Sequence, residues 1–187
     1  MSCGDIDLHC MLCRLSKGRT NVVPGTGPCE ARIVFIGEAP GKDEDLKAQP
    51  FVGRAGRILD EALLKSGVDR SKVYITNLVK CRPPGNRKPR KDEIRTCSVY
   101  LESELKEIQP SVVCALGQTA AQSLLDEKRS MEDLVSRDRR ISLAGFDVRL
   151  FVAYHPAACL YQRRHLASLK KQVRRSLSAA GLVKRKR

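Results

Sequence analysis

Hydrophobic positions along this chain follow two alternating periods. Short apolar runs rich in β-branched residues are typical of buried strands, and the stretches between them carry apolar residues every three or four positions, as helices do. The expected strands cover residues 31–37, 72–79, 111–117 and 146–156. The expected helices cover residues 54–67, 89–108, 118–126 and 163–181. This alternation predicts a three-layer α/β/α sandwich around a central, mostly parallel four-stranded sheet.

Three of the expected strands end in polar residues. Glu38 follows the first strand, Asn77 closes the second and His155 follows the last. Taken singly, each has an ordinary structural explanation, in a helix approach, a turn or a loop before proline. The carboxyl ends of parallel strands, however, meet at one edge of the sheet, where ligands bind in folds of this type. We therefore expect the three side chains to share one site.

The loop after the first strand, GEAPGKDED, combines glycines with three adjacent carboxylates. A phosphate-binding loop requires the pattern G-x-x-x-x-G-K-[ST]. Here Gly37 and Gly41 enclose only three residues, and Asp43 takes the place of the hydroxyl. Asp43, Glu44 and Asp45 would in addition repel a phosphate group. The loop therefore argues against nucleotide hydrolysis, while a magnesium ion bound by the three carboxylates remains an alternative.

Four of the eight cysteines form a pattern typical of a metal site. Cys10 and Cys13 are separated by two residues, and Cys81 and Cys97 follow with fifteen residues between them. Four thiolates can close a tetrahedral zinc site or hold an iron–sulfur cluster, and the spacing leaves both alternatives open. In either case the metal would fasten the N-terminal segment onto the loop after the second strand, which is a structural role.

The other four cysteines have weaker assignments. We expect Cys114, in the middle of the third strand, to be a small buried hydrophobe and Cys3 to lie in a loose terminus. Cys29 and Cys159 fit no pattern, although Cys159 lies four residues after His155.

Composition adds a nucleic-acid partner to this picture. The 187 residues, 42% of them hydrophobic, can bury one substantial core, and we expect a single domain over 1–187 with a basic tail at about 182–187. The 35 Lys and Arg against 21 Asp and Glu give a net charge of +14, which favours a polyanion such as nucleic acid. Basic residues cluster after the second strand, in the last helix and at the C-terminus, at Arg82, Arg87, Lys88, Arg90, Lys91, Arg163, Arg164, Lys170, Lys171, Arg174, Arg175 and the terminal KRKR.

Nothing in the hydrophobic pattern indicates a membrane protein. No apolar run approaches the roughly 18 residues that a membrane-spanning helix requires, and the N-terminal MSCGDIDLHC does not resemble a signal peptide. We therefore expect a cytosolic protein without a membrane partner, whose cysteines serve metal or redox chemistry rather than a disulfide framework.

Several motifs together resemble a known family. In order, the chain contains GEAPGKDED, PFVGRAGRIL, YITNLVKCRPPGNRKP and YHPAA, together with the four-cysteine pattern. This combination, which extends from about Cys10 to the last helix, is similar to the family 4 uracil-DNA glycosylases, the iron–sulfur type of archaea and bacteria. The resemblance implies an α/β/α fold and hydrolysis of the N-glycosidic bond of deoxyuridine in DNA. It also implies a [4Fe-4S] cluster on Cys10, Cys13, Cys81 and Cys97.

The resemblance gives roles to individual residues. Asn77 would read uracil, because its carbonyl can accept from N3–H while its NH2 group donates to O4, and cytosine presents the opposite pattern. Phe51 would stack on the flipped base, and His155 would donate to uracil O2, where negative charge develops as the bond breaks. Leu160 resembles the wedge that fills the vacated stack, with Cys159 as the competing position.

The resemblance does not settle how water is activated. Better-known relatives outside this family place an Asp at the position of Ala39, where this chain has a methyl group. Glu38 is the first candidate for orienting water or stabilising the positively charged sugar, and Glu44 is the second. Backbone groups of Glu38 and Ala39 would contact the base.

Two alternatives remain. A related family becomes trapped covalently on its product through a His in a loop insertion, but the corresponding stretch PPGNRKPRKDE contains no His, so turnover is expected. A non-catalytic module that binds DNA beside a cysteine-bound metal would have the same charge and cysteines, but it would not need Asn77, Phe51 and His155 together.

For the enzyme we expect a monomer in the prokaryotic cytosol or nucleoid, acting on single- or double-stranded uracil-containing DNA, with a replication or repair protein as a further partner.

Overall fold

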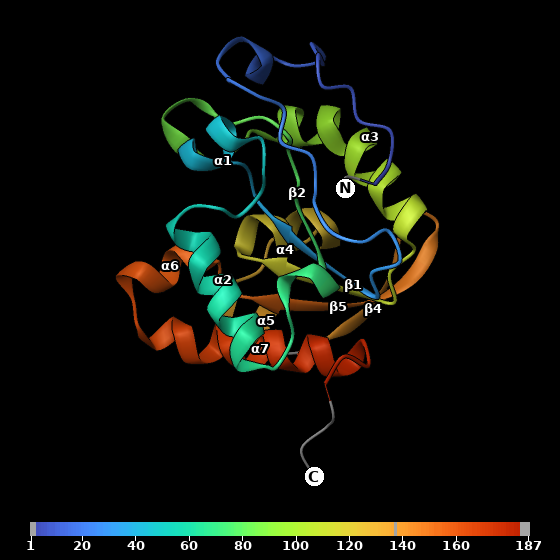
Figure 1. The fold of residues 1–187 in the computed structure, drawn as a ribbon, viewed down its shortest axis with the longest axis vertical. Coiled ribbons are helices and arrows are strands. Elements are labelled where there is room, and N and C mark those ends of the chain that lie inside the picture. The colour runs from blue at the N-terminus through green and yellow to red at the C-terminus, as the bar shows by residue number, and fades with distance from the viewer. Residues whose placement is uncertain (1–2, 137, 184–187) are drawn as a thin grey trace.

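The computed structural model describes residues 3–136 and 138–183, which form a five-stranded sheet covered by helices (Figure 1). The strands are β1 (Ile33–Gly37), β2 (Tyr74–Asn77), β3 (Val112–Leu116), β4 (Arg139–Leu143) and β5 (Phe146–Ala153). Their order across the sheet is β2-β1-β3-β5-β4, and all neighbours are parallel except β4 and β5. The expected α/β class with a mostly parallel sheet is confirmed.

The prediction of four strands was wrong, because it missed β4. This strand has no fully buried position, and its sequence RRISL begins with two arginines. An edge strand of this kind carries little apolar signal. A tight turn joins β4 to β5, and its residues Ala144 and Gly145 have φ values of 53° and 92°, a geometry typical of two-residue hairpins.

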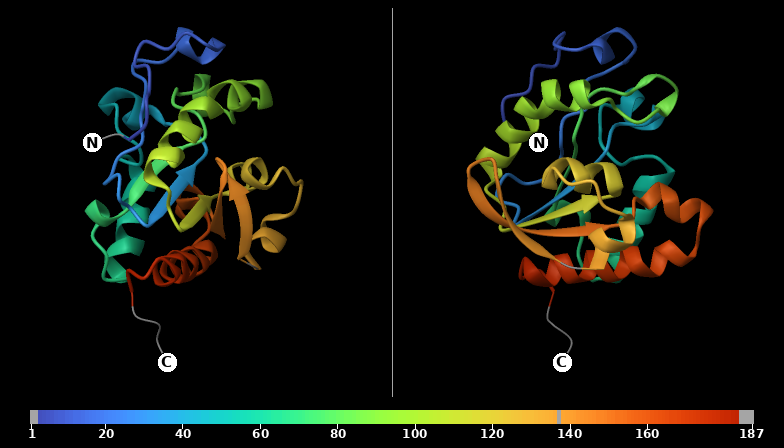
Figure 2. Two further views of the ribbon diagram at one scale, coloured as in Figure 1. Left: turned by 90° about the vertical axis from the view of Figure 1, so that its right-hand side faces the viewer. Right: turned by 180° about the vertical axis from the view of Figure 1, so that it is seen from behind.

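Helices cover both faces of the sheet. They are α1 (Lys42–Lys47), α2 (Arg54–Lys65), α3 (Lys91–Ile108), α4 (Gln118–Leu125), α5 (Met131–Ser136), α6 (Pro156–Tyr161) and α7 (Arg164–Ala179), with the short 3-10 turns η1 (Arg14–Lys17), η2 (Arg70–Lys72) and η3 (Pro84–Asn86). The core formed with α2, α6 and α7 lies on one face, and the core formed with α3, α4 and α5 lies on the other (Figure 2). Alternation along β1 supplies both cores, since Phe35 belongs to the first and Val34 and Ile36 to the second.

Two boundaries near the carboxyl edge of the sheet differ from the prediction. The acidic residues after β1, expected in a loop, form the short helix α1. The strand expected to reach residue 156 ends at Ala153, and His155 is the N-cap of α6. Pro156 explains this change, because proline favours the first position of a helix and lacks the N–H that a central strand would need.

The N-terminal segment is fastened to the body of the protein. Cys3 is 1% exposed and forms a disulfide with Cys29, and the amides of Gly4 and Asp5 donate to side chains of α3. The expectation that Cys3 lies in a loose terminus was therefore wrong, because a disulfide partner distant in sequence left no local signal. Cys114 is fully buried in β3, as expected.

The terminal KRKR of the predicted basic tail lies outside the described residues. Among the helices that the structure describes, none combines the length and the apolar character needed to cross a membrane.

Candidate functional site

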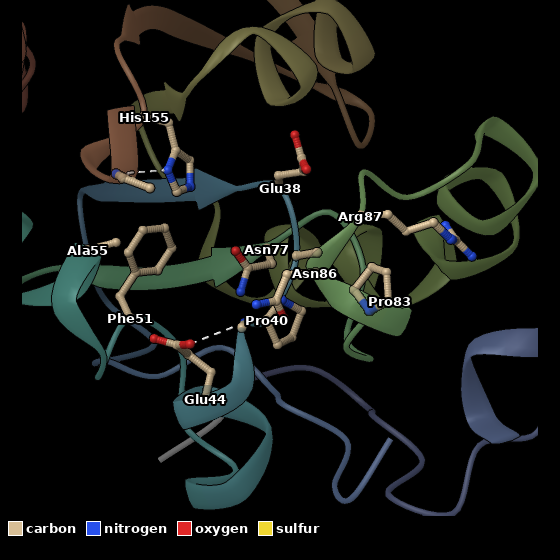
Figure 3. A pocket seen from close by; sticks show the side chains of 13 residues that line it. Glu38, Pro40, Glu44, Phe51, Ala55, Asn77, Pro83, Asn86, Arg87 and His155 are labelled. Carbon is tan, nitrogen blue, oxygen red and sulfur yellow. Dashed lines mark hydrogen bonds between the residues drawn. The ribbon is translucent and has the colours of Figure 1, made fainter. Parts of the chain in front are cut away.

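A cavity of about 310 Å³ lies at the carboxyl edge of the parallel strands. Glu38 after β1, Asn77 at the end of β2 and His155 after β5 all line it, so the parallel topology brings the three residues together as expected. Phe51, from the turn between α1 and α2, adds an aromatic ring to the wall (Figure 3). The volume is in the range of small-molecule sites and accommodates one planar heterocycle.

Asn77 presents an unsatisfied amide inside this cavity. The residue is 1% exposed, and its Oδ1 is buried without a hydrogen-bond partner among the residues that the structure describes. A buried acceptor left unsatisfied costs about 1–3 kcal/mol, so a ligand N–H that reached Oδ1 would recover this free energy. Gly37 makes room for the amide, because a Cβ at that position would lie 2.4 Å from Oδ1.

The Phe51 ring is held by an unusual backbone conformation. Its φ is 52°, in the left-handed region that aromatic residues seldom adopt. The ring centroid lies 5.8 Å from that of His155, with an interplanar angle of 34°. A Cβ at Gly37 would also collide with the ring. Phe51 therefore borders the cavity beside both Asn77 and His155 (Figure 3).

His155 is a neutral hydrogen-bond donor. As the N-cap of α6, its Nδ1 accepts a hydrogen bond from the Ala157 amide at 3.1 Å. Burial lowers the pKa of His155 to about 4, while the nearby Glu44 acts in the opposite direction. Because Nδ1 keeps its lone pair, the ring proton is on Nε2. Gly117, with a φ of 95°, permits this position, since a Cβ there would lie 2.9 Å from the Cβ of His155.

The three carboxylates of α1 have different surroundings and do not converge. Asp45 is buried and accepts from the amides of Thr20 and Asn21, which anchors the N-terminal segment. Glu44 accepts three amide hydrogen bonds, one from the N-cap of α1 and two from the turn that follows Phe51. Asp43, the third carboxylate, is exposed. The magnesium alternative therefore loses its support, and no three His, Cys, Asp or Glu of the described residues are grouped to hold one metal ion.

Glu38 differs from Glu44 in that its carboxylate accepts no hydrogen bond from the other residues of the site drawn in Figure 3. Both Glu38 and Ala39 are half-buried and line the cavity. Ala39 contributes a methyl group to the wall, as expected from the sequence. Glu38 is thus the carboxylate at this site that a water molecule or a ligand can approach without displacing a protein donor.

Sequence reasoning missed one wall of the cavity. It is formed by Pro83, Asn86 and Arg87 in the loop after β2, and none of the three was predicted to belong to the site. Their position directly beyond the carboxyl end of a parallel strand was the signal available. The Arg87 side chain points away from the cavity (Figure 3) and pairs with the buried Glu93 at 2.7 and 2.8 Å. This bond lowers the pKa of Glu93 to about 2, against the effect of burial.

Leu160, the expected wedge, lies on α6 five residues after His155. It is 36% exposed, whereas Cys159 is buried. Of the two competing positions, only Leu160 offers its side chain to a partner. Tyr161 beside it is 86% exposed, so this end of α6 presents two large hydrophobic side chains to solvent.

The four cysteines of the expected metal site line a second, smaller cavity. They are Cys10, Cys13, Cys81 and Cys97, and all four are free thiols. Donors already approach two of the sulfurs: Arg19 contacts Cys81 Sγ at 3.6 Å, and the Lys80 amide contacts Cys97 Sγ at 3.3 Å. Burial raises the pKa of Cys81 to about 12, while Arg19 opposes this effect. A thiolate at Cys81 therefore requires a cationic partner in addition to Arg19.

The donor set fits a metal group held by four thiolates. The four thiols surround a common space. Four thiolates can close a tetrahedral zinc site or hold an iron–sulfur cluster, and the chemistry of these donors agrees with either group.

Comparison with known proteins agrees with the geometry. The family profile described as the uracil DNA glycosylase superfamily matches residues 24–178. A type-4 uracil-DNA glycosylase of Archaeoglobus fulgidus is 45% identical over 159 residues, which cover 83% of this chain and 80% of the relative. The type-4 enzyme of Saccharolobus solfataricus is 40% identical over 178 residues, covering 91% of this chain and 82% of its own. That of Thermotoga maritima is 43% identical over 154 residues, covering 82% and 79%.

The type-4 and type-5 uracil-DNA glycosylases differ in how similar they are to this chain. A type-5 uracil-DNA glycosylase of Pyrobaculum aerophilum is 31% identical over 178 residues, whereas the type-4 enzyme of the same organism is 41% identical over 156. The fold, the matched profile and these identities agree with the resemblance that the motifs indicated. The chain therefore belongs to the uracil-DNA glycosylase superfamily and, within it, groups with the type-4 enzymes.

Proposed function

We propose that this protein excises uracil from DNA by hydrolysing the N-glycosidic bond of deoxyuridine, leaving free uracil and an abasic site. The observation that carries this proposal is the buried Oδ1 of Asn77, which has no hydrogen-bond partner in the described part of the chain and lies in a cavity sized for one base. Its surroundings match a uracil ring, with an aromatic face from Phe51 and a neutral donor from His155.

Recognition begins with a base that has left the stack. The glycosidic bond is inaccessible inside a duplex, so the target nucleotide must turn into the cavity. There, Oδ1 of Asn77 accepts from N3–H and its NH2 group donates to O4, a pairing that cytosine cannot satisfy. Each mispaired buried polar group costs about 1–3 kcal/mol. Leu160, exposed on α6, fills the space that the base vacates.

Bond cleavage places negative charge on the departing uracil. His155 is oriented by the Ala157 amide at Nδ1, so its Nε2–H is free to donate to uracil O2. A fixed donor aimed at a developing charge stabilises the transition state more than the ground state. The neutral imidazole suits this role, because it donates without moving its proton to the base.

Glu38 orients the attacking water in this proposal. Its carboxylate lies at the cavity without a hydrogen bond to the other residues of the site in Figure 3. The oxygens of Glu44 accept three backbone amides instead, so its loss would act through the turn they hold. Under single-turnover conditions, we expect Glu38→Gln to slow base release about 10- to 100-fold while the thermal midpoint stays unchanged.

The four thiols would hold a [4Fe-4S] cluster, which supplies structural cross-linking rather than reaction chemistry. Cys10 and Cys13 come from the N-terminal segment, Cys81 follows β2 and Cys97 lies on α3, so the cluster would join three parts of the chain. Zinc has a filled d shell and no visible absorption. Visible absorbance of the purified protein, together with iron and sulfide analysis, therefore distinguishes a cluster from zinc.

The deciding experiment is incubation with a single-uracil oligonucleotide followed by alkaline cleavage, which reports abasic sites. We expect cleavage at the uracil position, and none with a thymine control. DNA binding without abasic sites would instead support the non-catalytic module. Single- and double-stranded substrates should be compared, because the net charge of +14 serves either.

The setting of this activity is part of the proposal. The type-4 relatives above come from archaea and from Thermotoga maritima, and we place the protein on prokaryotic chromosomal DNA as a monomer. A replication or repair protein as a further partner stays a prediction. Light scattering of the purified chain, with and without DNA, tests the monomer.

A further inference from the structure

We infer that Arg70 is a positioning residue for the base-stacking ring of Phe51, an inference that rests on the proposed function. Arg70 begins η2, directly before β2, and it is not among the residues that line the cavity. Its guanidinium nevertheless holds the turn that carries the ring. Nη2 donates to the carbonyl of Pro50 at 2.7 Å, and Nη1 donates to the carbonyl of Phe51 at 3.0 Å.

The turn needs such support because of its conformation. Phe51 has a φ of 52°, and a large L residue persists in this region only where its surroundings enforce it. The first turn of α2 packs directly on the Phe51 carbonyl, since a Cβ at Gly56 would lie only 1.9 Å from that oxygen. Phe51 as a whole is 5% exposed, so water has little access to this residue and the donor from Arg70 is difficult to replace.

The opposite side of the turn is held by Glu44. Its Oε1 accepts from the amides of Val52 and Gly53 at 3.0 and 2.8 Å. The turn is thus held at two carbonyls by a guanidinium and at two amides by a carboxylate, with the stacking ring between them. The guanidinium itself is positioned by Asp60 on α2, because Oδ1 of Asp60 accepts from Nη1 of Arg70 at 2.7 Å.

Loss of the guanidinium would release the ring and not the base-reading amide. Two carbonyls would lose their donors, and the backbone could relax toward negative φ. Asn77 is held separately by β2 and its neighbours. Stacking on an aromatic ring contributes about tenfold or more to the affinity for a base. We therefore expect Arg70→Ala to weaken free-uracil inhibition and to reduce kcat/KM by about tenfold.

The experiment is a double-mutant cycle with Arg70→Ala, Phe51→Ala and the combined variant. Each is assayed for kcat/KM on a single-uracil oligonucleotide, for inhibition by free uracil and for binding to uracil-free DNA. Lys72→Ala is the matched control, because it removes one positive charge from the same 3-10 turn at an exposed position. Arg70→Lys keeps the charge but donates from a single point, so it should fall between Arg70→Ala and the wild type.

The expected result is strong non-additivity. If Arg70 acts through the ring, the combined variant is no worse than Phe51→Ala alone, and binding to uracil-free DNA matches that of Lys72→Ala. Additive losses, or unchanged uracil inhibition in Arg70→Ala, would overturn the inference. If Arg70→Ala does not fold, the cycle is run with Arg70→Lys and judged by the same criterion. A wild-type protein that releases no uracil would instead overturn the proposed function.

Discussion

At the scale of single residues, the proton on His155 is fixed by its neighbours. The Ala157 amide occupies Nδ1, and burial lowers the pKa of the ring to about 4. An imidazolium would break this hydrogen bond and place a charge in a partly buried cavity. The site therefore presents a neutral Nε2–H donor over the whole physiological range.

This lowered pKa makes stability depend on pH. The unfolded chain binds a proton at His155 near pH 6.5 and the folded chain only near pH 4, so the contribution is present above about pH 6.5 and is lost as the pH falls toward 4. We expect up to about 2 kcal/mol of destabilisation from this residue. Urea unfolding at pH 7 and pH 4.5 measures it, with His155→Gln as the control. An equal pH effect in that variant would contradict the assignment.

Asn77 should separate activity from stability. Its Oδ1 has no partner among the described residues, so Asn77→Ala removes a binding group without removing a hydrogen bond to that atom. We expect kcat/KM to fall about 10- to 1000-fold and the thermal midpoint to change little. Thr76→Val is the contrasting neighbour, because its hydroxyl bonds Glu104 and Lys80 in a buried network. That variant should lose stability first. A fully active Asn77→Ala would exclude the base-reading role.

At the scale of elements, the loop after β2 contains cations with different tasks. Arg87 is committed to the buried Glu93, whereas Lys88 is exposed next to it. We expect Lys88→Ala to reduce the slope of log affinity for DNA against log salt by about 1 without changing stability. Arg87→Ala should instead destabilise the protein by about 1–3 kcal/mol, because the buried Glu93 loses its bidentate partner. DNA titrations at several salt concentrations, together with thermal unfolding, are carried out on both variants. If the two variants changed the salt dependence and the thermal stability equally, the separate roles of Arg87 and Lys88 would be contradicted.

The sequence predicted those elements whose own residues determine them. The strands β1 and β3 are continuous, buried apolar runs, β2 and the second half of β5 are buried and rich in β-branched or aromatic residues, and α2, α3, α4 and α7 have clear helical periodicity. Since parallel topology brings strand ends together, Glu38, Asn77 and His155 could be grouped before the structure was known. β4 could not be found, because its pattern depends on pairing with β5 rather than on an apolar run.

Parts of the site that depend on contacts distant in sequence were also missed. The bond between Cys3 and Cys29 spans 26 positions, and neither residue has a local motif. The hydrogen bond from Arg70 to Phe51 spans 19 positions. Its acceptor is a backbone carbonyl, which has no sequence signature. Glu44 was expected as a second catalytic candidate from its place in an acidic stretch, and only the amides around it indicate a holding role.

At the scale of the whole molecule, one buried carboxylate joins the N-terminal segment, β2 and α3. Glu104, which is 0% exposed, accepts hydrogen bonds from Gly25, Tyr74, Thr76 and Lys80. The ammonium group of Lys80 also donates to the backbone at the end of β2. The backbone amide of Lys80 donates to Sγ of Cys97, a predicted cluster ligand. The end of β2 that carries Asn77 and the cysteine site are thus built on the same support.

The disulfide is a second anchor for the same N-terminal segment. The Cys3 amide donates to the Tyr74 hydroxyl at 3.1 Å, so the bond to Cys29 closes a loop directly over this network. Closing a loop of this length removes conformational entropy from the unfolded chain and stabilises a protein by about 3 kcal/mol. We expect reduction to lower the free energy of unfolding by about that amount while uracil excision persists at low temperature, because the bond lies away from the cavity.

Urea unfolding with and without a reductant measures this effect, and the double variant Cys3→Ser, Cys29→Ser is the control. The variant should match the reduced wild type and respond no further to the reductant. An equal response in both proteins would place the effect at the four-cysteine site, and no response in the wild type would show that the bond contributes nothing. The disulfide and the cysteine site then predict an order of failure: loss of the disulfide weakens the segment, whereas loss of the cysteine site, whose lining includes Cys97 of α3, should abolish stable folding around the cavity.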